Sequence, residues 1–313
     1  MSGAVVLAVL QGVFTGAFRS GTSILYAALG EVIVERGGII NLGLEGCMLV
    51  GACSGFIAAV ETGNAYLALV AGAVAGSAFN LVLGYLVVTR RANQLATGLA
   101  LQFMALGLTA IFGANYVQRR IEGLDTLQVP GLANLPLIGQ AVFQGDVLTL
   151  GLLPISLVVW WVLYRTRWGL AVRTVGESRT VAFAVGLRPE WLQYQALAVG
   201  GLFGGLGGAH LSLSYARVWI EGMTAGRGFI AVALVIFATW HPLRAVLGAL
   251  LFGGAIAFQL QLQARNAAVS PFLLDMLPYL LPLAVLLVWR LWGRGKTHNQ
   301  FPEGLSAVFE GTT

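Results

Sequence analysis

Long stretches without a charged residue dominate the pattern of hydrophobic and polar positions along this chain. The longest lie at residues 62–89, 92–118, 191–216 and 245–264. Each reaches or exceeds the roughly 20 residues that a helix needs to cross the hydrocarbon layer of a bilayer. Several such stretches in one chain indicate a polytopic membrane protein and argue strongly against a soluble domain.

We predict an all-α fold with about ten transmembrane segments, two of them short, in a single transmembrane domain over residues 1–313. The predicted segments are 4–18, 22–34, 41–60, 66–88, 94–117, 147–164, 191–213, 227–240, 243–263 and 272–289. Between the fifth and sixth segments, Pro130, Pro136 and several glycines interrupt any helical pattern. Residues 118–146 are therefore expected to form a loop.

Positive charges give these segments an orientation. Five arginines lie in the loop at 165–190, namely Arg165, Arg167, Arg173, Arg179 and Arg188. Cytoplasmic loops carry an excess of Lys and Arg, so this loop is predicted to be cytoplasmic. Alternation along the ten segments then places the N-terminus and the C-terminus in the cytoplasm and makes 118–146 an extracytoplasmic loop.

The composition agrees with a lipid environment. Hydrophobic residues make up 58% of the chain and charged residues 10%, whereas soluble domains contain about 25% charged residues. The net charge of +5 comes mainly from arginines in short loops, which is typical of topology signals and does not favour a nucleic-acid partner. Cys47 and Cys53 are interpreted as small apolar side chains on one helix, and no metal-ligand spacing occurs.

Two polar regions interrupt the apolar pattern, at residues 30–46 and 214–228. Each contains glycines and charged residues, and each precedes a helix in a corresponding part of one half of the chain. Gly-interrupted segments at matching positions in two halves point to an internal repeat and to a transport path. Because segments 2–5 and 7–10 start on opposite sides of the membrane, we predict that the repeat is inverted.

Polar side chains in and near these regions are candidates for lining a translocation path, since charges at membrane depth usually face the protein interior or water. The candidates are Asn41, Glu45, Asn93, Gln94, Gln102, Glu221 and Arg227. For the residues at 93–102, hydrogen bonding between helices is an equally good explanation. For Glu31, Glu35 and Arg36 we favour a salt-bridge cluster that locks a broken helix, with the last two at the cytoplasmic surface.

The cytoplasmic loop contains a short amphipathic stretch at 178–185, flanked by Gly176 and Gly186. A short surface helix between two membrane helices needs a partner to cover its apolar face, which is either another protein or the membrane surface. We expect Val181, Ala182 and Val185 to form that face. Gly186 is expected to end the helix in a left-handed conformation.

Three motifs make the chain similar to a known family. Trp168-Gly169-Leu170, Val175-Gly176-Glu177, Ala182 and Gly186 resemble the coupling loop of ABC import permeases for branched-chain amino acids, ribose and nucleosides. The stretch from Glu35 to Gly46 is similar to the second-segment motif of the nucleoside-type permeases, and 221–230 is similar to their later motif.

The resemblance implies a non-catalytic permease in the bacterial inner membrane, with partners that do the chemistry. These are an ABC ATPase subunit that binds ATP and Mg²⁺, a second homologous permease subunit and an extracytoplasmic solute-binding lipoprotein. No cofactor is expected in this chain. The residues expected to contact the ATPase are Gly176, Glu177, Ser178, Arg179, Val181, Ala182, Val185 and Gly186.

The expected function is therefore ATP-driven import of a small molecule, most specifically a nucleoside, by alternating access. Permeases for riboflavin or a simple sugar remain open as alternatives within the family. An ion-coupled secondary transporter is a further alternative, because Glu45 places a carboxylate at membrane depth. A channel would need a filter sequence, and none is visible.

Overall fold

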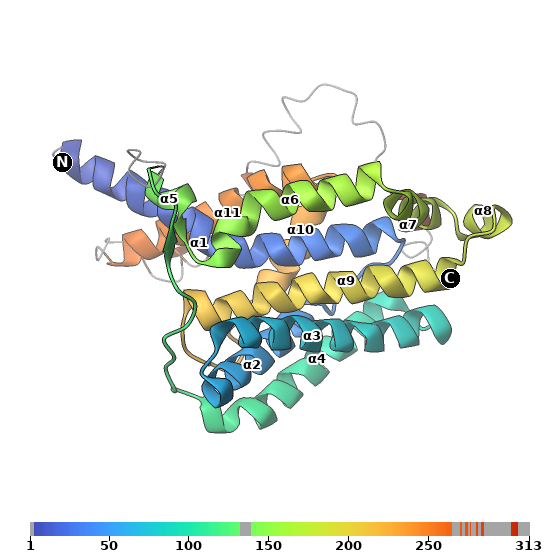
Figure 1. Ribbon diagram of the computed structural model, residues 1–313, viewed down its shortest axis with the longest axis horizontal. Coiled ribbons are helices and arrows are strands. Elements are labelled where there is room, and N and C mark those ends of the chain that lie inside the picture. The colour runs from blue at the N-terminus through green and yellow to red at the C-terminus, as the bar shows by residue number, and fades with distance from the viewer. Residues whose placement is uncertain are drawn as a thin grey trace.

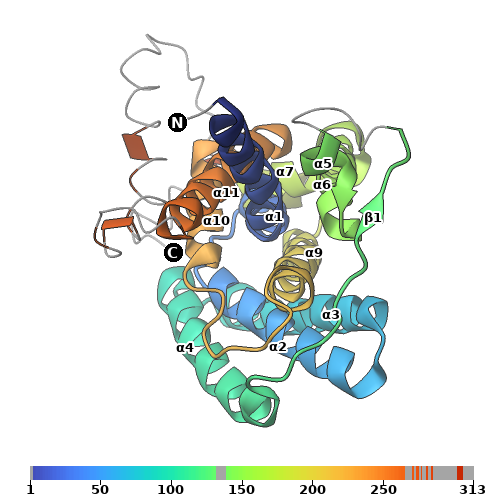
Figure 2. The same ribbon diagram turned by 90° about the vertical axis from the view of Figure 1, so that its left-hand side faces the viewer.

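The computed structural model describes residues 3–131 and 139–264 without a break, and residues 270, 273–274, 276, 280, 283–284 and 302–305. The fold is mostly helical, as predicted, and its long helices form a bundle (Figures 1 and 2). A pair of two-residue strands is the exception among these residues, with β1 (Leu127–Gln128) antiparallel to β2 (Gln144–Gly145).

The helices follow the apolar stretches of the sequence closely. They are α1 (Gly3–Arg36), α2 (Leu44–Thr62), α3 (Ala65–Gly84), α4 (Gln94–Gly113), α5 (Gly139–Phe143), α6 (Val147–Arg165), α7 (Arg167–Glu177), α8 (Arg179–Ala184), α9 (Pro189–His210), α10 (Arg227–Phe237) and α11 (Pro242–Ala264). Five-residue π-helical turns extend α3 to Thr89 and α9 to Tyr215, and a 3₁₀ turn extends α4 to Tyr116.

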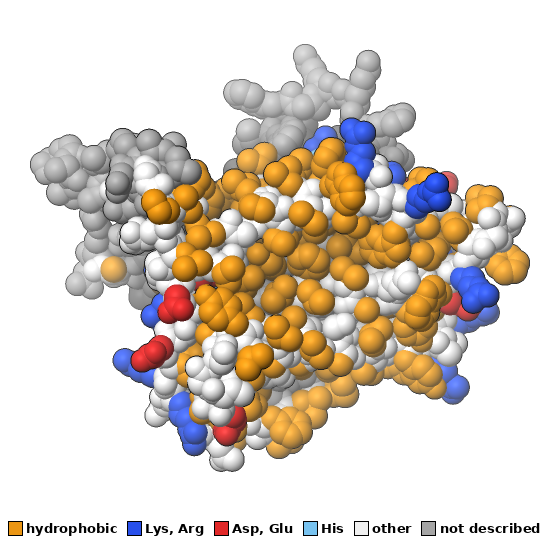
Figure 3. Space-filling view, viewed as in Figure 1, with side chains coloured by type: hydrophobic (Ala, Val, Ile, Leu, Met, Phe, Trp, Pro, Cys, Tyr) orange, Lys and Arg blue, Asp and Glu red, His pale blue; other side chains and the backbone are white. Residues whose placement is uncertain are grey.

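Six of the described helices are long and apolar enough to cross a membrane. They are Leu44–Thr62, Ala65–Thr89, Gln94–Tyr116, Val147–Arg165, Pro189–Tyr215 and Pro242–Ala264. They correspond to predicted segments 3 to 7 and 9, whereas segment 272–289 falls largely outside the described residues. Hydrophobic side chains cover the middle of the molecular face in Figure 3, and charged side chains gather at its two ends.

The first two predicted segments, 4–18 and 22–34, form one continuous helix, α1, so the prediction of two separate segments is wrong. The Thr22 hydroxyl is satisfied within the helix, because Thr22 Oγ1 donates to the Phe18 carbonyl (2.7 Å), while the Ser20 hydroxyl donates to the Tyr215 hydroxyl (3.3 Å). Gly21 lies against the backbone of α11, where a Cβ would be 2.7 Å from the Ala249 carbonyl oxygen. Gly21 therefore allows α1 to pack closely against α11, and Thr22 does not interrupt the helix.

A continuous α1 changes the predicted placement of the N-terminus. Its 34 residues span about 51 Å at 1.5 Å per residue, and it begins at the end of the bundle opposite α7 and α8 (Figure 1). The first described residues of α1 therefore lie at the end of the bundle opposite the described part of the 165–190 loop, whereas the ten-segment topology places the N-terminus on the side of that loop. Residues 303–305 do lie beside α7, where the Glu303 N–H donates to Glu177 (3.1 Å).

Two further differences concern short helices. The predicted eighth segment is the 11-residue α10, which at about 16 Å is too short to cross the bilayer. In the 165–190 loop, α7 was not predicted. Its buried residues Gly169, Val172, Val175 and Gly176 recur at helical spacing, and this pattern could have revealed it. The described parts of 118–146 lie at the end of the bundle opposite α8 (Figure 1).

Helices from one half of the chain pack against helices from the other half. α1 packs along α11, α9 packs along α3, and α1 and α9 lie side by side in the centre. Small residues bring these backbones together, since a Cβ at Gly76 would lie 2.6 Å from the Gly201 carbonyl oxygen. This crossed pairing supports the predicted repeat, because each half supplies the neighbour of the other half's first helix.

Candidate functional site

The chain between α1 and α2 leaves helical geometry inside the bundle, where the first break was predicted. Gly38 has φ +80°, a left-handed conformation that glycine adopts without strain. Side chains satisfy the freed backbone. Gln193 donates to the Gly37 carbonyl (3.1 Å), and the Gln94 side chain accepts from the Ile40 N–H (2.9 Å). Irregular backbone at membrane depth needs such partners.

A buried polar cluster surrounds this break, and we call Glu31, Glu35, Asn41 and Asn80 the Glu31 cluster. Glu31 Oε1 accepts from the Asn41 N–H (3.0 Å), and the Asn41 side chain donates to Asn80 Oδ1 (2.8 Å). Asn80 donates in turn to the Leu197 carbonyl (2.7 Å). Glu31 Oε2 and Asn41 Oδ1 are buried and find no hydrogen-bond partner among the described residues.

Glu35 and Arg36 hold the end of α1 against the turn after α10. The Trp240 indole N–H donates to Glu35, and Arg36 donates to the Trp240 carbonyl (3.3 Å) and to the Tyr164 hydroxyl (3.2 Å). Both side chains are buried, and neither forms an ion pair within the described part of the chain. The predicted structural role agrees with these contacts, but the lock consists of hydrogen bonds and does not lie at the surface.

Glu45 joins the two interrupted regions. In the first turn of α2, its Oε1 accepts from the Gly226 N–H (2.7 Å) and its Oε2 from the Gly228 N–H (2.5 Å). Gly226 precedes α10 with φ +83°, and a Cβ at Gly228 would overlap the Glu45 backbone. The N-termini of α2 and α10 thus converge on one carboxylate, whose negative charge matches the positive ends of both helix dipoles.

The other path candidates divide between this junction and the surface. Gln102 is buried on α4, packed against Gly46 at the start of α2. Arg227 is half-buried, lies over the Tyr215 ring (5.5 Å) and donates to carbonyls of its own loop. Asn93 caps the N-terminus of α4 at its exposed end, and Glu221 is exposed.

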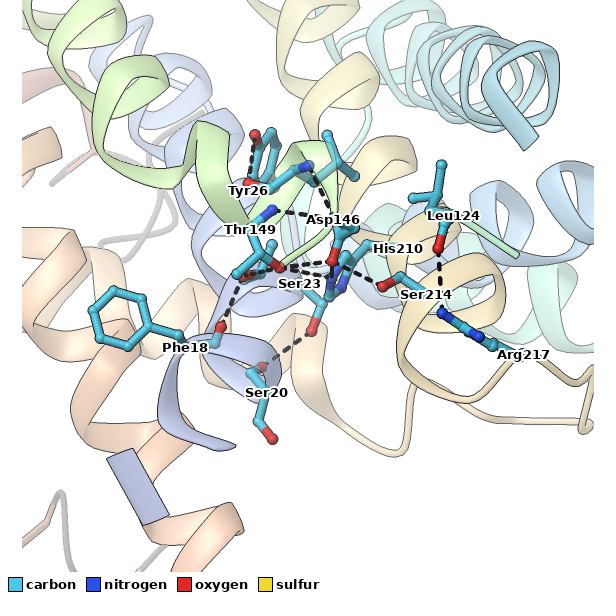
Figure 4. A network of polar contacts seen from close by, with 12 residues as sticks. Phe18, Ser20, Ser23, Tyr26, Leu124, Asp146, Thr149, His210, Ser214 and Arg217 are labelled. Carbon is cyan, nitrogen blue, oxygen red and sulfur yellow. Dashed lines mark hydrogen bonds and ion pairs between the residues drawn. The ribbon is translucent and has the colours of Figure 1, made fainter. Parts of the chain in front are cut away.

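The opposite end of the bundle holds a second buried cluster, Asp146, Thr149, His210 and Ser214, which we call the Asp146 cluster (Figure 4). Asp146 precedes α6, and its Oδ1 accepts from the N–H groups of Leu148 (2.9 Å) and Thr149 (3.1 Å). Its Oδ2 accepts from the hydroxyls of Thr149 (2.7 Å) and Ser214 (2.8 Å) and lies 3.3 Å from His210 Nε2.

This cluster ties three helices together and keeps a carboxylate ionised. Thr22 of α1 donates to Thr149 of α6 (3.3 Å), while His210 and Ser214 lie in α9 and its π-helical turn. Burial alone would raise the pKa of Asp146. The electrostatic interaction with His210 and the hydrogen bonds that the Asp146 carboxylate accepts outweigh burial. Together they hold the pKa of Asp146 well below its usual range.

Sequence analysis missed the Asp146 cluster. A signal was present, because Asp146 and His210 stand next to or inside apolar stretches, where ionisable residues are costly and usually functional or paired. The two residues are far apart in sequence, so only the packing of α6 and α9 against α1 shows that they meet.

The predicted coupling residues surround α8. Ser178 caps the helix by accepting from the Val181 N–H (3.3 Å). Gly186 has φ +83°, and the Leu187 N–H reaches back to the Ala182 carbonyl (3.0 Å), which confirms the predicted left-handed ending.

The exposed face of α8 differs from the predicted one. Val181, Phe183 and Val185 are 55%, 73% and 67% exposed, but Ala182 is fully buried against its own chain. Gly176 is also buried, whereas Glu177 and Arg179 are exposed and Ser178 is half-buried. Ala182 was expected on the docking face and instead anchors the helix to the bundle.

The family described as branched-chain amino acid transport system / permease component matches residues 12–288. The chain belongs to this family. It is therefore a multi-pass permease component of an ABC transporter. This subunit is non-catalytic, and a partner subunit hydrolyses ATP.

Several characterised or named relatives are similar over most of their length. A putative glucose ABC transporter permease of Haloferax volcanii is 42% identical over 83% of this chain and 80% of its own. A guanosine ABC transporter permease of Bacillus subtilis is 35% identical over 74% and 76%, respectively. A nucleoside ABC transporter permease of Lactococcus lactis is 32% identical over 90% and 93%. No solved structure matches the chain.

Proposed function

We propose that this permease forms part of the translocation path of an ATP-driven importer for nucleosides. The observation that carries the path is the Glu45 junction, where two helices begin inside the bundle and face each other. Discontinuous helices whose N-termini meet within a membrane domain are typical of transport sites. In this conformation both carboxylate oxygens of Glu45 accept hydrogen bonds from Gly226 and Gly228. Solute passage therefore requires the start of α2 to separate from the start of α10.

The nucleoside assignment is supported by the two relatives named for guanosine and nucleoside transport. A simple sugar is the second candidate, because the relative at 42% identity is named a putative glucose permease. Asn41, Gln94 and Gln102 supply amide groups near the break. An amide can both donate to and accept from the hydroxyls of ribose or a hexose and the polar edge of a nucleobase. The side chains therefore fit a neutral polar solute of either kind.

The proposed importer contains further subunits. An ATPase that binds ATP and Mg²⁺ contacts the exposed α8 face with Val181, Phe183 and Val185, since an apolar patch outside the bilayer needs a covering partner. A second homologous permease subunit completes the path. An extracytoplasmic solute-binding lipoprotein delivers solute at the opposite end, where the residues after α4 line an open pocket of about 480 Å³ with Arg119, Arg120 and Asp125.

A reconstituted complex tests this function. The permease, the second permease subunit, the ATPase and the binding protein are placed in liposomes, and uptake of labelled guanosine, uridine and glucose is measured with and without ATP. We expect ATP-dependent uptake of the two nucleosides and none of glucose. Glucose uptake alone would establish the sugar candidate, and uptake that does not depend on ATP would contradict the importer.

A further inference from the structure

The C-terminal end of α7 lies directly between the first break and the described C-terminal residues. Gly176 is buried, and a Cβ added to it would overlap the Arg36 carbonyl oxygen at the end of α1. From the other side, a Cβ at Gly38 would lie 3.2 Å from the Gly176 Cα. No side chain separates the two backbones at this point.

The C-terminal residues cover the outer side of the same glycine. A Cβ at Gly304 would lie 2.6 Å from the Gly176 carbonyl oxygen, and the Glu303 N–H donates to the Glu177 carboxylate (3.1 Å). Leu305 is 1% exposed and packs into the main hydrophobic core. Residues 303–305 are thus fastened to the bundle on one side and to the end of α7 on the other.

The contact of Gly176 with residues 36–38 and 303–305 lies between α8 and the first break. Ser178, which caps α8, comes two residues after Gly176, and the Gly176 contact lies on the residues that begin the break. Close-packed backbone transmits displacement because it has no compressible side chain to absorb it. α7 therefore cannot move towards the bundle without pushing residues 36–38.

We propose that Gly176 and the segment 303–305 form the contact through which movement of α8 reaches the break in the solute path. The C-terminal segment acts as a clasp that keeps α7 pressed against residues 36–38. This inference rests on the proposed function, in which α8 contacts the ATPase, and it adds the route from that contact to the Glu31 cluster and the Glu45 junction.

The glycine contact is tested with Gly176→Ala and Gly304→Ala in the reconstituted complex. Gly107→Ala is the matched control, because Gly107 lies in α4 and an added Cβ there meets nothing within 4 Å. We expect both test variants to retain the ATPase subunit and to hydrolyse ATP, while uptake per ATP hydrolysed falls at least about tenfold, equivalent to about 1.4 kcal/mol. The control keeps wild-type uptake.

A measurement on the unmodified complex covers the case in which Gly176→Ala does not fold. Hydrogen exchange of residues 36–43 is compared with and without the ATPase subunit and with and without ATP. We expect exchange in 36–43 to change together with exchange in 176–185. If 176–185 becomes protected while 36–43 does not change, or if both glycine variants transport normally, the inference is overturned. If the ATPase never protects α8, the proposed function fails instead.

Discussion

The Glu31 cluster and the Asp146 cluster are both buried polar groups, at opposite ends of the bundle, but they are satisfied differently. Asp146 lies 3.3 Å from His210 Nε2 and uses both oxygens, with four donors besides His210. Glu31 has no ion-pair partner within the described residues and lies beside a second carboxyl, that of Glu35, while Asn41 Oδ1 finds no hydrogen-bond partner among those residues. The first arrangement fixes three helices in place, whereas the second leaves groups ready to change partners.

This difference also follows the surroundings of each cluster. The Glu31 cluster lies at the end of the bundle that carries α7 and α8, next to an irregular segment. Buried polar groups that lack partners are destabilising, so a native protein retains them where strain or function requires it. The comparison therefore predicts a rigid end at Asp146 and a changeable end at Glu31.

The largest effect is expected from Asp146→Ala. The change leaves His210, two hydroxyls and two backbone N–H groups without their common acceptor, and breaking such a buried network costs about 3–5 kcal/mol. Unfolding of the purified permease in detergent measures the loss. Asp125→Ala is the control, since Asp125 is an exposed carboxylate near the same end. Equal stability of the two variants would contradict the rigid end.

The stability lost in Asp146→Ala should depend on pH, and this dependence tests whether Asp146 is ionised in the folded protein. The pKa of Asp146 is lowered in the folded protein, so its contribution to stability is fully present above the unfolded pKa of about 3.9. The contribution is lost as the pH falls through the lower folded pKa. The stability gap between wild type and Asp146→Ala should persist from pH 7 to 5, and the contribution of the Asp146 carboxylate should be lost only below about pH 4. A gap that closes between pH 7 and 5 would show that Asp146 is not held ionised.

Glu45→Leu is expected to have the next largest effect. It leaves the N–H groups of Gly226 and Gly228 without acceptors, at about 1–3 kcal/mol for each buried group. Uptake should fall at least about tenfold while the ATPase subunit still copurifies, because α8 is remote from the junction. Glu45→Gln is the matched variant and should be intermediate, since it keeps one acceptor. Normal uptake by Glu45→Leu would remove the junction from the path.

Asn41→Leu tests the changeable end. It removes the hydrogen bond to Asn80, and we expect a loss of about 1–3 kcal/mol together with reduced uptake. Asn80→Leu should have a similar effect, and the double variant should be less destabilised than the sum, because the two side chains bond to each other. Strict additivity of the two losses in unfolding measurements would show that the pair is not coupled in this way.

The smallest effect on stability is expected from Val185→Asp on the exposed face of α8. The free energy of unfolding should change by no more than about 0.5 kcal/mol, but binding of the ATPase subunit should weaken. Ala182→Trp is the contrasting variant, because its overpacking occurs within the permease and should cost about 1–3 kcal/mol of stability. Titration of the ATPase against both variants separates docking from folding, and unchanged binding by Val185→Asp would place the partner elsewhere.

The sequence predicted the membrane class, six of the spanning helices, both interrupted regions and the short helix at 178–185. These succeeded because lipid selects long uncharged stretches and because charges or glycines within them are unusual. The same logic failed at residues 19–22, where polar residues separated two predicted segments although a hydroxyl such as that of Thr22 is satisfied inside a helix. For α10 the predicted start at residue 227 is correct, but the helix ends at Phe237, three residues before the predicted end at 240.

Residue roles show the same division. The sequence alone determined that Asn41, Glu45 and Arg36 are polar groups within an apolar region, and that these groups need partners away from lipid. Only the tertiary structure decided which partners they have: Glu45 joins the start of α10, and Asp146 meets His210 from a distant helix. The physical reason is that burial cost depends on residue type and local sequence, whereas hydrogen bonds and close backbone contacts depend on positions that the packing of distant helices sets.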